Sequence, residues 1–301
     1  MRVLVTGASG FIGSAACDAL LVRGDEVVGL TRDPEKARRT NPRVAWHAWE
    51  PTLERPPAAA FEGVGGVVNL LGEKINQRWT GDAKRRIVES RRTGTHNLVQ
   101  AIAGLERKPT VLVSQSAIGY YGDRGATVVD ESAEAGTGFD AEVAQEWEKA
   151  AREVESTGVR LAIVRTGHVL DPSGGLLGQL LTPFKLGVGG PIAGGGQYMS
   201  WIHIDDEVGI LLWALDDEKV SGVVNSTAPN PVTNRELSKA LGRALNRPAI
   251  LPVPGLALDL MFGSEFAAVL KGGQRVAARR ALDLGYKFRH PDLDEALSDL
   301  L

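Results

Sequence analysis

The first 32 residues, "MRVLVTGASGFIGSAACDALLVRGDEVVGLTR", decide the fold class of this chain. A short apolar run at residues 3–5 is followed by three glycines at three-residue spacing, Gly7, Gly10 and Gly13. A helical pattern then extends to about residue 22, and a second β-branched run follows at residues 26–30. This order predicts a strand, a tight glycine-rich turn, a helix and a parallel strand.

Each glycine of this turn has a separate predicted task. One permits the tight turn, one lets backbone N–H groups approach a pyrophosphate, and one allows close contact between helix and strand. The N-terminus of the helix points its partial positive charge at the phosphates. We therefore expect dinucleotide binding by the three glycines and by their neighbours Ser9, Phe11 and Ile12. A glycine-rich turn without a ligand is the alternative.

The end of the second strand indicates which dinucleotide binds. An NAD-binding protein usually places an Asp or Glu there, which accepts a hydrogen bond from the ribose 2′-hydroxyl. This chain has Thr31 and Arg32 instead, and a guanidinium can hold a 2′-phosphate in a fork. NADP(H) is therefore expected in preference to NAD(H). The alternative is a solvated charged loop in which the carboxylate of Asp33 turns inward.

Composition and charge narrow the classes of partner. The chain has 301 residues, of which 43% are hydrophobic and 24% are charged, as in ordinary globular proteins. A net charge of −3 gives no electrostatic case for binding nucleic acid or an anionic membrane, so a small-molecule substrate is the expected partner. The single cysteine, Cys17, cannot form an internal disulfide, and the histidines show no metal-ligand spacing. With no signal peptide or membrane span evident, we expect a cytoplasmic protein without a metal.

Strands and helices continue to alternate along the next part of the chain. Strands are expected at residues 43–49, 65–72, 110–116 and 159–167, and helices at about 82–103 and 140–156. This alternation predicts an α/β fold, a Rossmann-type doubly wound parallel sheet with its ligand along the carboxyl ends of the strands. We expect residues 1–167 to form this domain, with later segments returning to it, and residues 168–301 to form a smaller lobe that covers the substrate.

Several motifs resemble the extended short-chain dehydrogenase/reductase superfamily of sugar-nucleotide epimerases and dehydratases. They are "TGASGFIG" at the N-terminus, "NLLG" after the fourth strand, "SQSAIGYYGD" after the fifth and "WIHIDD" in the second lobe. Longer segments resemble the atypical subfamily of sugar-nucleotide epimerase-like proteins: "GEKINQRWTGDAKRRIVESR", "FDAEVAQEWEKAA", "GGPIAGGGQYMSWIHIDD" and "RHPDLDEAL". The resemblance covers essentially the whole chain.

The resemblance implies cofactor roles for the residues that match the superfamily pattern. The three glycines would contact the phosphates, and Thr31 and Arg32 would contact the adenosine ribose. Leu70, Leu71 and Gly72 would form a backbone wall beside the cofactor. Arg165, in the sixth strand, is also expected at the cofactor.

The catalytic positions that the resemblance implies mostly differ here. Superfamily chemistry uses a Ser that holds the substrate oxygen, and a Tyr and a Lys at i, i+4 on one helix, where the Lys lowers the pKa of the Tyr. Ser116 matches the Ser, but residues 132–156 contain no tyrosine, and their only lysine is Lys149. The Asn expected in the long helix is replaced by Arg91.

The stretch "SAIGYYGDR", residues 116–124, offers two substitutes for the missing tyrosine. Tyr120 and Arg124 have i, i+4 spacing, but the glycines among them are expected to break any helix there. Tyr121 matches the aromatic residue of the superfamily's "YG", which commonly borders the substrate. We therefore take Ser116, Tyr120 and Tyr121 as candidate catalytic residues. The alternative is that both tyrosines are structural aromatics of a loop.

Six polar or aromatic residues are candidates for substrate contact. They follow the fourth strand, lie on the long helix or stand near the "HIDD" motif: Glu73, Lys84, Arg91, Gln197, Trp201 and His203. Lys84 and Arg91 could meet a substrate diphosphate. The alternatives are a charged connection at Glu73, a solvated basic face on the helix, and a packing role for His203.

Two classes of function are open from the sequence. The first is an NADP(H)-dependent oxidoreductase or epimerase that acts on a small polar, nucleotide-sugar-like substrate and protonates it with a non-standard group. The second is an NADP(H)-binding sensor or scaffold without turnover, to which the loss of the Tyr-Lys pair points. The resemblance includes relatives associated with cell division, and a homodimer through two long helices is common among relatives.

Overall fold

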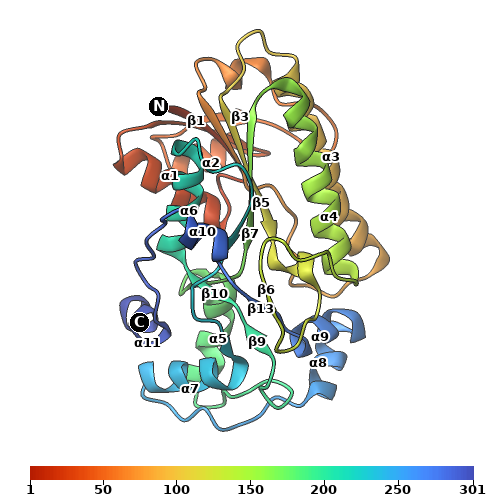
Figure 1. Ribbon diagram of the computed structural model, residues 1–301, viewed down its shortest axis with the longest axis vertical. Coiled ribbons are helices and arrows are strands. Elements are labelled where there is room, and N and C mark those ends of the chain that lie inside the picture. The colour runs from red at the N-terminus through yellow and green to blue at the C-terminus, as the bar shows by residue number, and fades with distance from the viewer.

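A computed structural model describes all 301 residues of the chain. At its centre, a seven-stranded sheet has the strand order β11-β7-β5-β4-β1-β2-β3, and every neighbouring pair is parallel (Figure 1). The strands of this sheet are β1 (Arg2–Thr6), β2 (Glu26–Thr31), β3 (Ala45–Ala48), β4 (Gly66–Asn69), β5 (Val111–Ala117), β7 (Arg160–Thr166) and β11 (Gly222–Ser226). The predicted Rossmann-type parallel sheet is therefore confirmed.

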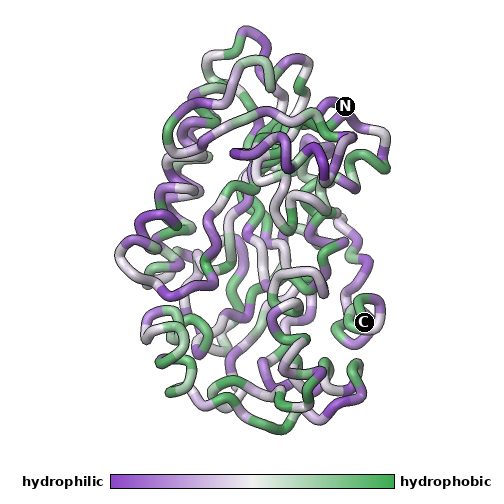
Figure 2. The backbone as a smooth tube through the Cα atoms, turned by 180° about the vertical axis from the view of Figure 1, so that it is seen from behind, coloured by the Kyte–Doolittle hydropathy of each residue, from purple (hydrophilic) through white to green (hydrophobic).

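Both faces of this sheet are apolar, and the alternation of side chains along the strands explains why. Val3 and Val5 on β1 belong to one core cluster, and Leu4 between them belongs to a second cluster on the opposite face. All three residues are completely buried. Because the strands read as continuous hydrophobic runs, helices must cover each face. In Figure 2, hydrophobic segments accordingly gather in the central strands.

Helices cover the two faces of the sheet. α1 (Phe11–Val22) and α6 (Ile204–Asp216) pack on one face, and α3 (Gly81–Ala103) and α4 (Phe139–Arg152) on the other (Figure 1). At the two opposite edges of the sheet, α2 (Pro34–Thr40) packs beside β3 and α10 (Arg279–Asp283) beside β11. None of the helices combines the length and the hydrophobicity that crossing a bilayer requires.

The remaining helices form the smaller part of the molecule, below the sheet in Figure 1. α5 (Gly175–Lys185), α7 (Asn234–Ala244) and α11 (Leu293–Leu300) enclose a separate apolar core around Trp201. α8 (Gly255–Phe262) and α9 (Ser264–Lys271) follow, and Phe266 of α9 packs against Trp79, with ring centroids 5.2 Å apart. This aromatic contact joins α9 to the start of α3.

Short elements complete the fold. The minor strands form three pairs, β10-β8, β12-β9 and β13-β6. Their bounds are β6 (Val128–Val129), β8 (His168–Asp171), β9 (Tyr198–Met199), β10 (Trp201–His203), β12 (Val232–Thr233) and β13 (Arg275–Val276). Single 3-10 turns occur at η1 (Ala58–Phe61), η2 (Ile118–Tyr121) and η3 (Glu153–Thr157).

The structure differs from the expected elements at a few places. The strand β11, which pairs with β7, was not among the predicted strands, and α6 covers one face of the sheet. The helix expected to reach residue 156 ends at Arg152 and continues as η3. The expectation that glycines break any helix around Tyr120 is wrong at Gly119, which lies inside η2, since a single 3-10 turn tolerates glycine. The division at residue 167 stays a prediction.

Candidate functional site

The glycine-rich turn between β1 and α1 has the geometry that a dinucleotide phosphate group requires. Gly7 has a φ of 63°, and a Cβ built on it would lie 2.6 Å from the carbonyl oxygen of Leu70. A Cβ on Gly13 would lie 2.1 Å from the carbonyl oxygen of Gly7, so only glycine allows α1 to approach β1 this closely. Gly10 is exposed, and its nearest neighbour would be that same oxygen at 3.0 Å. Its outer side is thus open to a ligand.

The first turn of α1 is free to receive an anion. No side chain caps the helix, and no acidic residue lies in its first turn. The N–H groups at the start of α1 therefore remain available, and the helix dipole favours a negative charge there. Ser9 is exposed at this point, whereas Phe11 and Ile12 are half-buried. The residues present fit a dinucleotide pyrophosphate, and binding itself stays a prediction.

The phenyl ring of Phe11 brings the second part of the chain close to this turn. A Cβ built on Gly174 would lie 2.5 Å from the ring, and one built on Gly175 would lie 3.1 Å from it. Gly174 precedes α5, whose first residue is Gly175. The start of α5 therefore lies directly against the predicted phosphate-binding turn.

At the ribose end of the predicted site, the question is whether the Asp33 carboxylate turns inward or leaves Arg32 to meet a 2′-phosphate. Its side chain accepts a hydrogen bond from the N–H of Lys36 at 3.0 Å and caps α2, so the carboxylate is engaged. Thr31 accepts a hydrogen bond from the N–H of Asp33 at 3.3 Å. Arg32 is exposed and forms no ion pair within the chain. The end of β2 thus presents a free guanidinium.

The wall after β4 is held by a buried chain of polar side chains. The hydroxyl of Thr6 donates to Oδ1 of Asn69 at 2.7 Å and accepts the N–H of Leu70 at 3.1 Å. The amide of Asn69 donates in turn to Thr95 and Ser114, both at 3.1 Å. These bonds link the carboxyl ends of β1, β4 and β5, and so fix the point from which Leu70, Leu71 and Gly72 leave the sheet.

Arg91 supports this wall, because its guanidinium lies beside Gly72 and bonds to the backbone of Glu73. It is only 9% exposed, and its guanidinium donates to the carbonyl oxygens of Glu73 at 3.0 Å and of Ile87 at 3.2 Å. A Cβ on Gly72 would lie 2.8 Å from that guanidinium. Burial lowers the pKa of Arg91 to about 10. Nη1 of Arg91 is thus engaged with the backbone, and contact of Arg91 with a substrate diphosphate stays a prediction.

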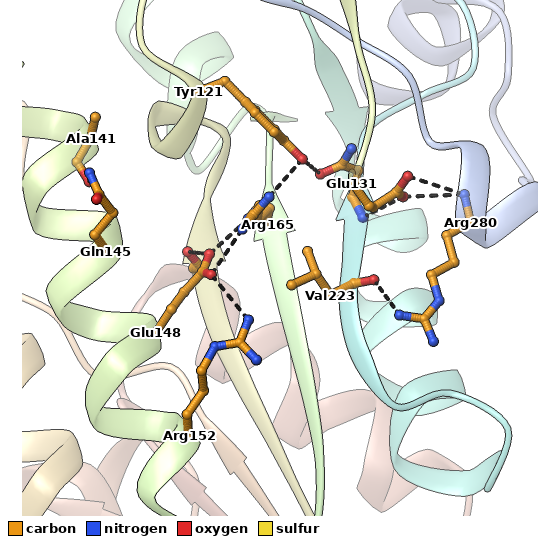
Figure 3. A network of polar contacts seen from close by, with 11 residues as sticks. Tyr121, Glu131, Ala141, Gln145, Glu148, Arg152, Arg165, Val223 and Arg280 are labelled. Atoms are coloured by element: carbon orange, nitrogen blue, oxygen red, sulfur yellow. Dashed lines mark hydrogen bonds and ion pairs between the residues drawn. The ribbon is translucent and has the colours of Figure 1, made fainter. Parts of the chain in front are cut away.

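Ser116 at the end of β5 forms a hydrogen bond with Glu148 of α4, which also forms a buried ion pair with Arg165. The hydroxyl of Ser116 donates to Glu148 at 2.8 Å, and Glu148 also receives Nε and Nη2 of Arg165 at 2.8 and 2.9 Å (Figure 3). Ser116, Glu148 and Arg165 are 1%, 4% and 2% exposed. Burial opposes the charge of Arg165, but its bonds to Glu148 outweigh burial and raise the pKa of the guanidinium. Ser116 is thus engaged with Glu148 and is not at a surface that a substrate reaches.

All three nitrogens of Arg165 form hydrogen bonds within the chain. Its Nη1 donates to the hydroxyl of Tyr121 at 3.0 Å, while the other two nitrogens bind Glu148 (Figure 3). Its guanidinium also lies 3.3 Å from the centroid of the Tyr120 ring. Arg165 is the cation at the centre of a buried network, and its contact with a cofactor stays a prediction.

The two candidate tyrosines differ in their surroundings. Tyr121 is completely buried, and its hydroxyl donates to Oδ1 of Asn225 at 2.7 Å while it accepts from Arg165. Burial raises the pKa of Tyr121 to about 12, and a catalytic role for Tyr121 stays a prediction. Tyr120 is half-buried, and its hydroxyl forms no hydrogen bond within the chain. A catalytic role for Tyr120 stays a prediction.

On the face of α4 that contacts β5, two carboxylates and an alanine lie where the superfamily has a Tyr-Lys pair. Asp140, Ala144 and Glu148 follow one another at four-residue spacing and therefore lie on one side of the helix. Glu148 binds Ser116, and a Cβ on Gly119 would lie 3.3 Å from the carboxylate of Asp140. Lys149 is exposed. This face thus presents a carboxylate, a methyl group and a second carboxylate.

An open cleft of about 340 Å³ lies between the start of α4 and α9. The rings of Trp79 and Phe139 line it, together with three carboxylates, Asp123, Asp140 and Glu265. The ammonium of Lys84 pairs with Glu265 at 2.6 Å and lies 5.0 Å from the centroid of the Phe139 ring. Lys84 is therefore at the rim of the cleft, where a substrate can approach.

The remaining candidates for substrate contact differ in their burial and in their hydrogen-bond partners. Glu73 is half-buried beside Arg91, and the amide of Gln197 donates to the carbonyl oxygens of Ile192 and Leu270, each at 3.2 Å. Contact of Glu73 or Gln197 with a substrate stays a prediction. Trp201 is completely buried and donates its N–H to the carbonyl oxygen of Asn230. Contact of Trp201 with a substrate stays a prediction.

His203 caps the start of α6, and its contact with a substrate stays a prediction. It is 1% exposed, and its Nδ1 accepts the N–H of Asp205 at 3.0 Å at the start of α6. Its ring stacks on His290 with centroids 3.8 Å apart. Burial, together with His290, lowers the pKa of His203, so the ring is neutral and Nε2 carries the hydrogen. Although His203, Asp205 and His290 bring their ligand atoms within 4.8 Å, this tautomer leaves His203 without a lone pair for a metal.

Glu207, buried beneath the carboxyl ends of β7 and β11, gives a pH-dependent prediction. Its carboxyl group binds the hydroxyls of Thr166 at 2.8 Å and Ser226 at 2.6 Å, and burial raises its pKa from 4.5 to about 7. Between these pH values the unfolded chain loses the proton and the folded chain keeps it. The free energy of unfolding should therefore fall by about 3 kcal/mol as pH rises from about 4.5 to above 7.

Glu207→Gln removes this titration. Its stability relative to the unmodified protein should thus increase by about 3 kcal/mol over the same pH range, as measured by urea unfolding at several pH values. A stability difference that does not change with pH would show that Glu207 titrates normally.

Sequence reasoning missed Glu148, Asp140, Asn225 and Glu207. The signal for Glu148 was a carboxylate among apolar neighbours on the inner side of an amphipathic helix, in "VAQEWEKAA". Asp140 stands four residues before Ala144 and eight before Glu148, so the same helical face could have identified it. No comparable signal exists for Asn225, because its partner Tyr121 is 104 residues away.

Comparison with known proteins places these features in a family. The model of the NAD dependent epimerase/dehydratase family matches residues 3–225, and a domain of unknown function, DUF1731, matches residues 253–300. The chain is 39% identical to the chloroplastic SDR39U1 homolog of Arabidopsis thaliana, over 100% of this chain and 87% of that protein. It is 38% identical to epimerase family protein SDR39U1 of Bos taurus, with 100% of each chain covered.

Solved structures agree with this. The crystal structure of human epimerase family protein SDR39U1 with NADPH matches with a TM-score of 0.91 at 36% identity, covering 100% of this chain and 99% of that one. UDP-glucuronic acid 4-epimerase from Bacillus cereus, in complex with UDP-glucuronic acid and NAD, shares the fold with a TM-score of 0.80 at 18% identity, covering 100% and 98%. The expected resemblance is confirmed, and the chain belongs to the NAD-dependent epimerase/dehydratase family.

Proposed function

We propose that this chain binds NADP(H) along the carboxyl ends of β1, β2 and β4 and acts as an oxidoreductase or epimerase on a small polar substrate held in the cleft between α4 and α9. The observation that carries the proposal is the combination of an uncapped α1 after the glycine-rich turn with a free Arg32 at the end of β2. When bound, the cofactor supplies hydride transfer. The chain supplies binding, orientation and proton transfer.

The preference for NADP(H) rests on the charges at the end of β2. A carboxylate there would bind a ribose 2′-hydroxyl and repel a 2′-phosphate, but Asp33 is used as the cap of α2. Arg32 is free to form a charge-assisted fork with a phosphate. The human relative solved with NADPH supports the same preference.

The cleft supports a small polar substrate. Trp79 and Phe139 offer apolar ring surface, and the neighbouring carboxylates offer hydrogen-bond acceptors for hydroxyl groups. A sugar-like ring, with one apolar side and several hydroxyls, has complementary chemistry. We place the protein in the cytoplasm, because its single cysteine, Cys17, is a buried free thiol that suits a reducing compartment. The homodimer stays a prediction.

Arg32→Ala tests the proposed selectivity. The variant should bind NADPH about tenfold or more weakly than the unmodified protein, while its affinity for NADH should stay unchanged, because NADH has no 2′-phosphate. Fluorescence titrations with both cofactors measure the two affinities. Arg39→Ala is the matched control, since Arg39 is also exposed and lies on the adjacent α2. An equal loss for NADPH and NADH in the Arg32 variant would contradict the selectivity argument.

A second function, cofactor binding without turnover, is favoured by one observation. Ser116 and Tyr121, two of the residues expected to act on a substrate, are locked into the buried network around Arg165. A sensor or scaffold needs only the cofactor site. Substrate-dependent loss of NADPH absorbance in a screen of carbonyl sugars would exclude the sensor. An epimerase would leave net absorbance unchanged, so cofactor extracted after incubation with sugar nucleotides should be checked for transient reduction.

A further inference from the structure

We propose that Asp140 is the proton-transfer group of the cleft, accepting the proton of a substrate hydroxyl during oxidation and returning it during reduction. This assignment rests on the proposed function, since it needs a nicotinamide cofactor beside the cleft. It goes beyond the resemblance, which implies a tyrosine in this role and supplies none in α4.

The position of Asp140 is the first argument. It lies in the first turn of α4 and lines the cleft together with Phe139, the residue before it. On its other side, it lies against Gly119, three residues after Ser116, where a built Cβ would be 3.3 Å from the Asp140 carboxylate. Asp140 thus connects the substrate cleft with the carboxyl end of β5. In folds of this type the cofactor binds along that edge of the sheet.

The second argument is that Asp140 has no competing partner among the charged groups around the cleft. From α9, Glu265 is paired with Lys84 of α3 at 2.6 Å. From the loop after η2, Asp123 accepts the N–H groups of Gly125 at 3.0 Å and Gly273 at 3.2 Å. Asp140 forms no ion pair and no hydrogen bond with another side chain, and only the backbone N–H groups of Asp140 and Ala141 at the start of α4 contact its carboxylate. Of the three carboxylates in the cleft, Asp140 is the one that also contacts Gly119 after β5.

Ala144, one helical turn after Asp140, also fits a carboxyl group as the proton-transfer group. Ala144 occupies the position at which a lysine would lower the pKa of a proton donor, and it is buried and carries no charge. A carboxyl group needs no such lysine, because its ordinary pKa already lies below neutrality. Partial burial raises the pKa of Asp140, and the N–H of Ala141 at the start of α4 acts in the opposite direction. Burial prevails, which moves the group toward the range useful for acid-base catalysis.

The chemical step balances with these groups. In oxidation, the Asp140 carboxylate takes the hydroxyl proton of a secondary alcohol while the carbinol C–H bond breaks and its hydride goes to NADP⁺. The products are a ketone, NADPH and a protonated Asp140, which then releases its proton to water in the cleft. In the reverse direction, protonated Asp140 donates to the carbonyl oxygen as the hydride is returned to carbon.

The test measures the pKa of Asp140 by carbon NMR of aspartate-labelled protein, separately with NADP⁺ and with NADPH bound. The two cofactors differ by one positive charge on the nicotinamide ring. A carboxylate within about 10 Å of that ring should have a pKa about half a unit or more lower in the NADP⁺ complex. The signal is assigned by its loss in Asp140→Asn, or in Asp140→Ser if the first variant fails to fold. Asp294, which pairs with Arg243 on the surface, is the control and should not shift.

The possible results separate this inference from the function on which it rests. A lower pKa of Asp140 with NADP⁺, with Asp294 unchanged, supports the assignment. Equal pKa values in the two complexes would overturn it and leave cofactor binding standing. If neither NADP⁺ nor NADPH binds, the proposed function fails and the assignment of Asp140 fails with it.

Discussion

Replacing Gly10 with alanine is expected to weaken NADPH binding by about a hundredfold or more while the fold is retained. Gly10 has a φ of −83°, which alanine adopts without strain, and the added Cβ would meet only the Gly7 carbonyl oxygen at 3.0 Å. The Cβ would otherwise project from the exposed end of α1, where the pyrophosphate must approach the N–H groups. The free energy of unfolding, measured by thermal denaturation, should therefore change by no more than about 1 kcal/mol. Fluorescence titration should show the loss of NADPH binding.

Gly81→Ala is the matched control for this variant. Gly81 is the first residue of α3, and a Cβ on it would have no neighbour within 4 Å. The control should keep its affinity for NADPH. If the Gly10 variant binds NADPH as tightly as the control does, the phosphates do not lie at the start of α1, and the proposed location of the cofactor is wrong.

Replacing Glu148 with glutamine is expected to destabilise the protein by about 3–5 kcal/mol, because it leaves the charge of Arg165 buried and unpaired. Glu148 receives two nitrogens of Arg165 and the hydroxyl of Ser116, and all three side chains are buried. Arg152, 3.8 Å from Glu148, does not replace the lost charge, since it is itself a cation. Urea unfolding measures the change in free energy.

Glu146→Gln on the same helix makes the same chemical change at the surface. Glu146 lies 3.8 Å from Arg92, and both side chains are exposed, so its replacement should cost no more than about 1 kcal/mol. A double variant, Glu148→Leu with Arg165→Met, should recover part of the stability lost in Glu148→Gln, because no charge remains buried. Similar losses for Glu148→Gln and Glu146→Gln would contradict a structural role for the buried ion pair.

Much of the fold could be predicted from the sequence because its signals are local. The three glycines and the apolar runs around them lie within one short segment, and their spacing alone determines the first strand, turn and helix. The strand β11 was not predicted, although its segment "GVVNS" contains two β-branched valines. Its pairing with β7 joins residues about 60 positions apart, and no local pattern specifies such a partner.

The candidate site was harder to predict, because chemistry at a buried site depends on partners that are distant in the chain. Ser116 and Tyr121 have the residue types that catalysis requires, but Glu148 and Asn225 engage their hydroxyls. Arg165 lies on β7 near the edge of the sheet where the cofactor is expected, but its guanidinium binds Glu148. Residue type therefore predicted which side chains would gather at the end of β5, and only the structure showed which of them are free.

Titration of the unmodified protein with NADPH and NADH directly measures whether this chain binds NADP(H) at the turn between β1 and α1. We expect saturable binding at one site per chain, with NADPH bound more tightly than NADH and competed by NADP⁺. Fluorescence that does not saturate with either cofactor would contradict the claim, and would leave the glycine-rich turn as a feature of the fold alone.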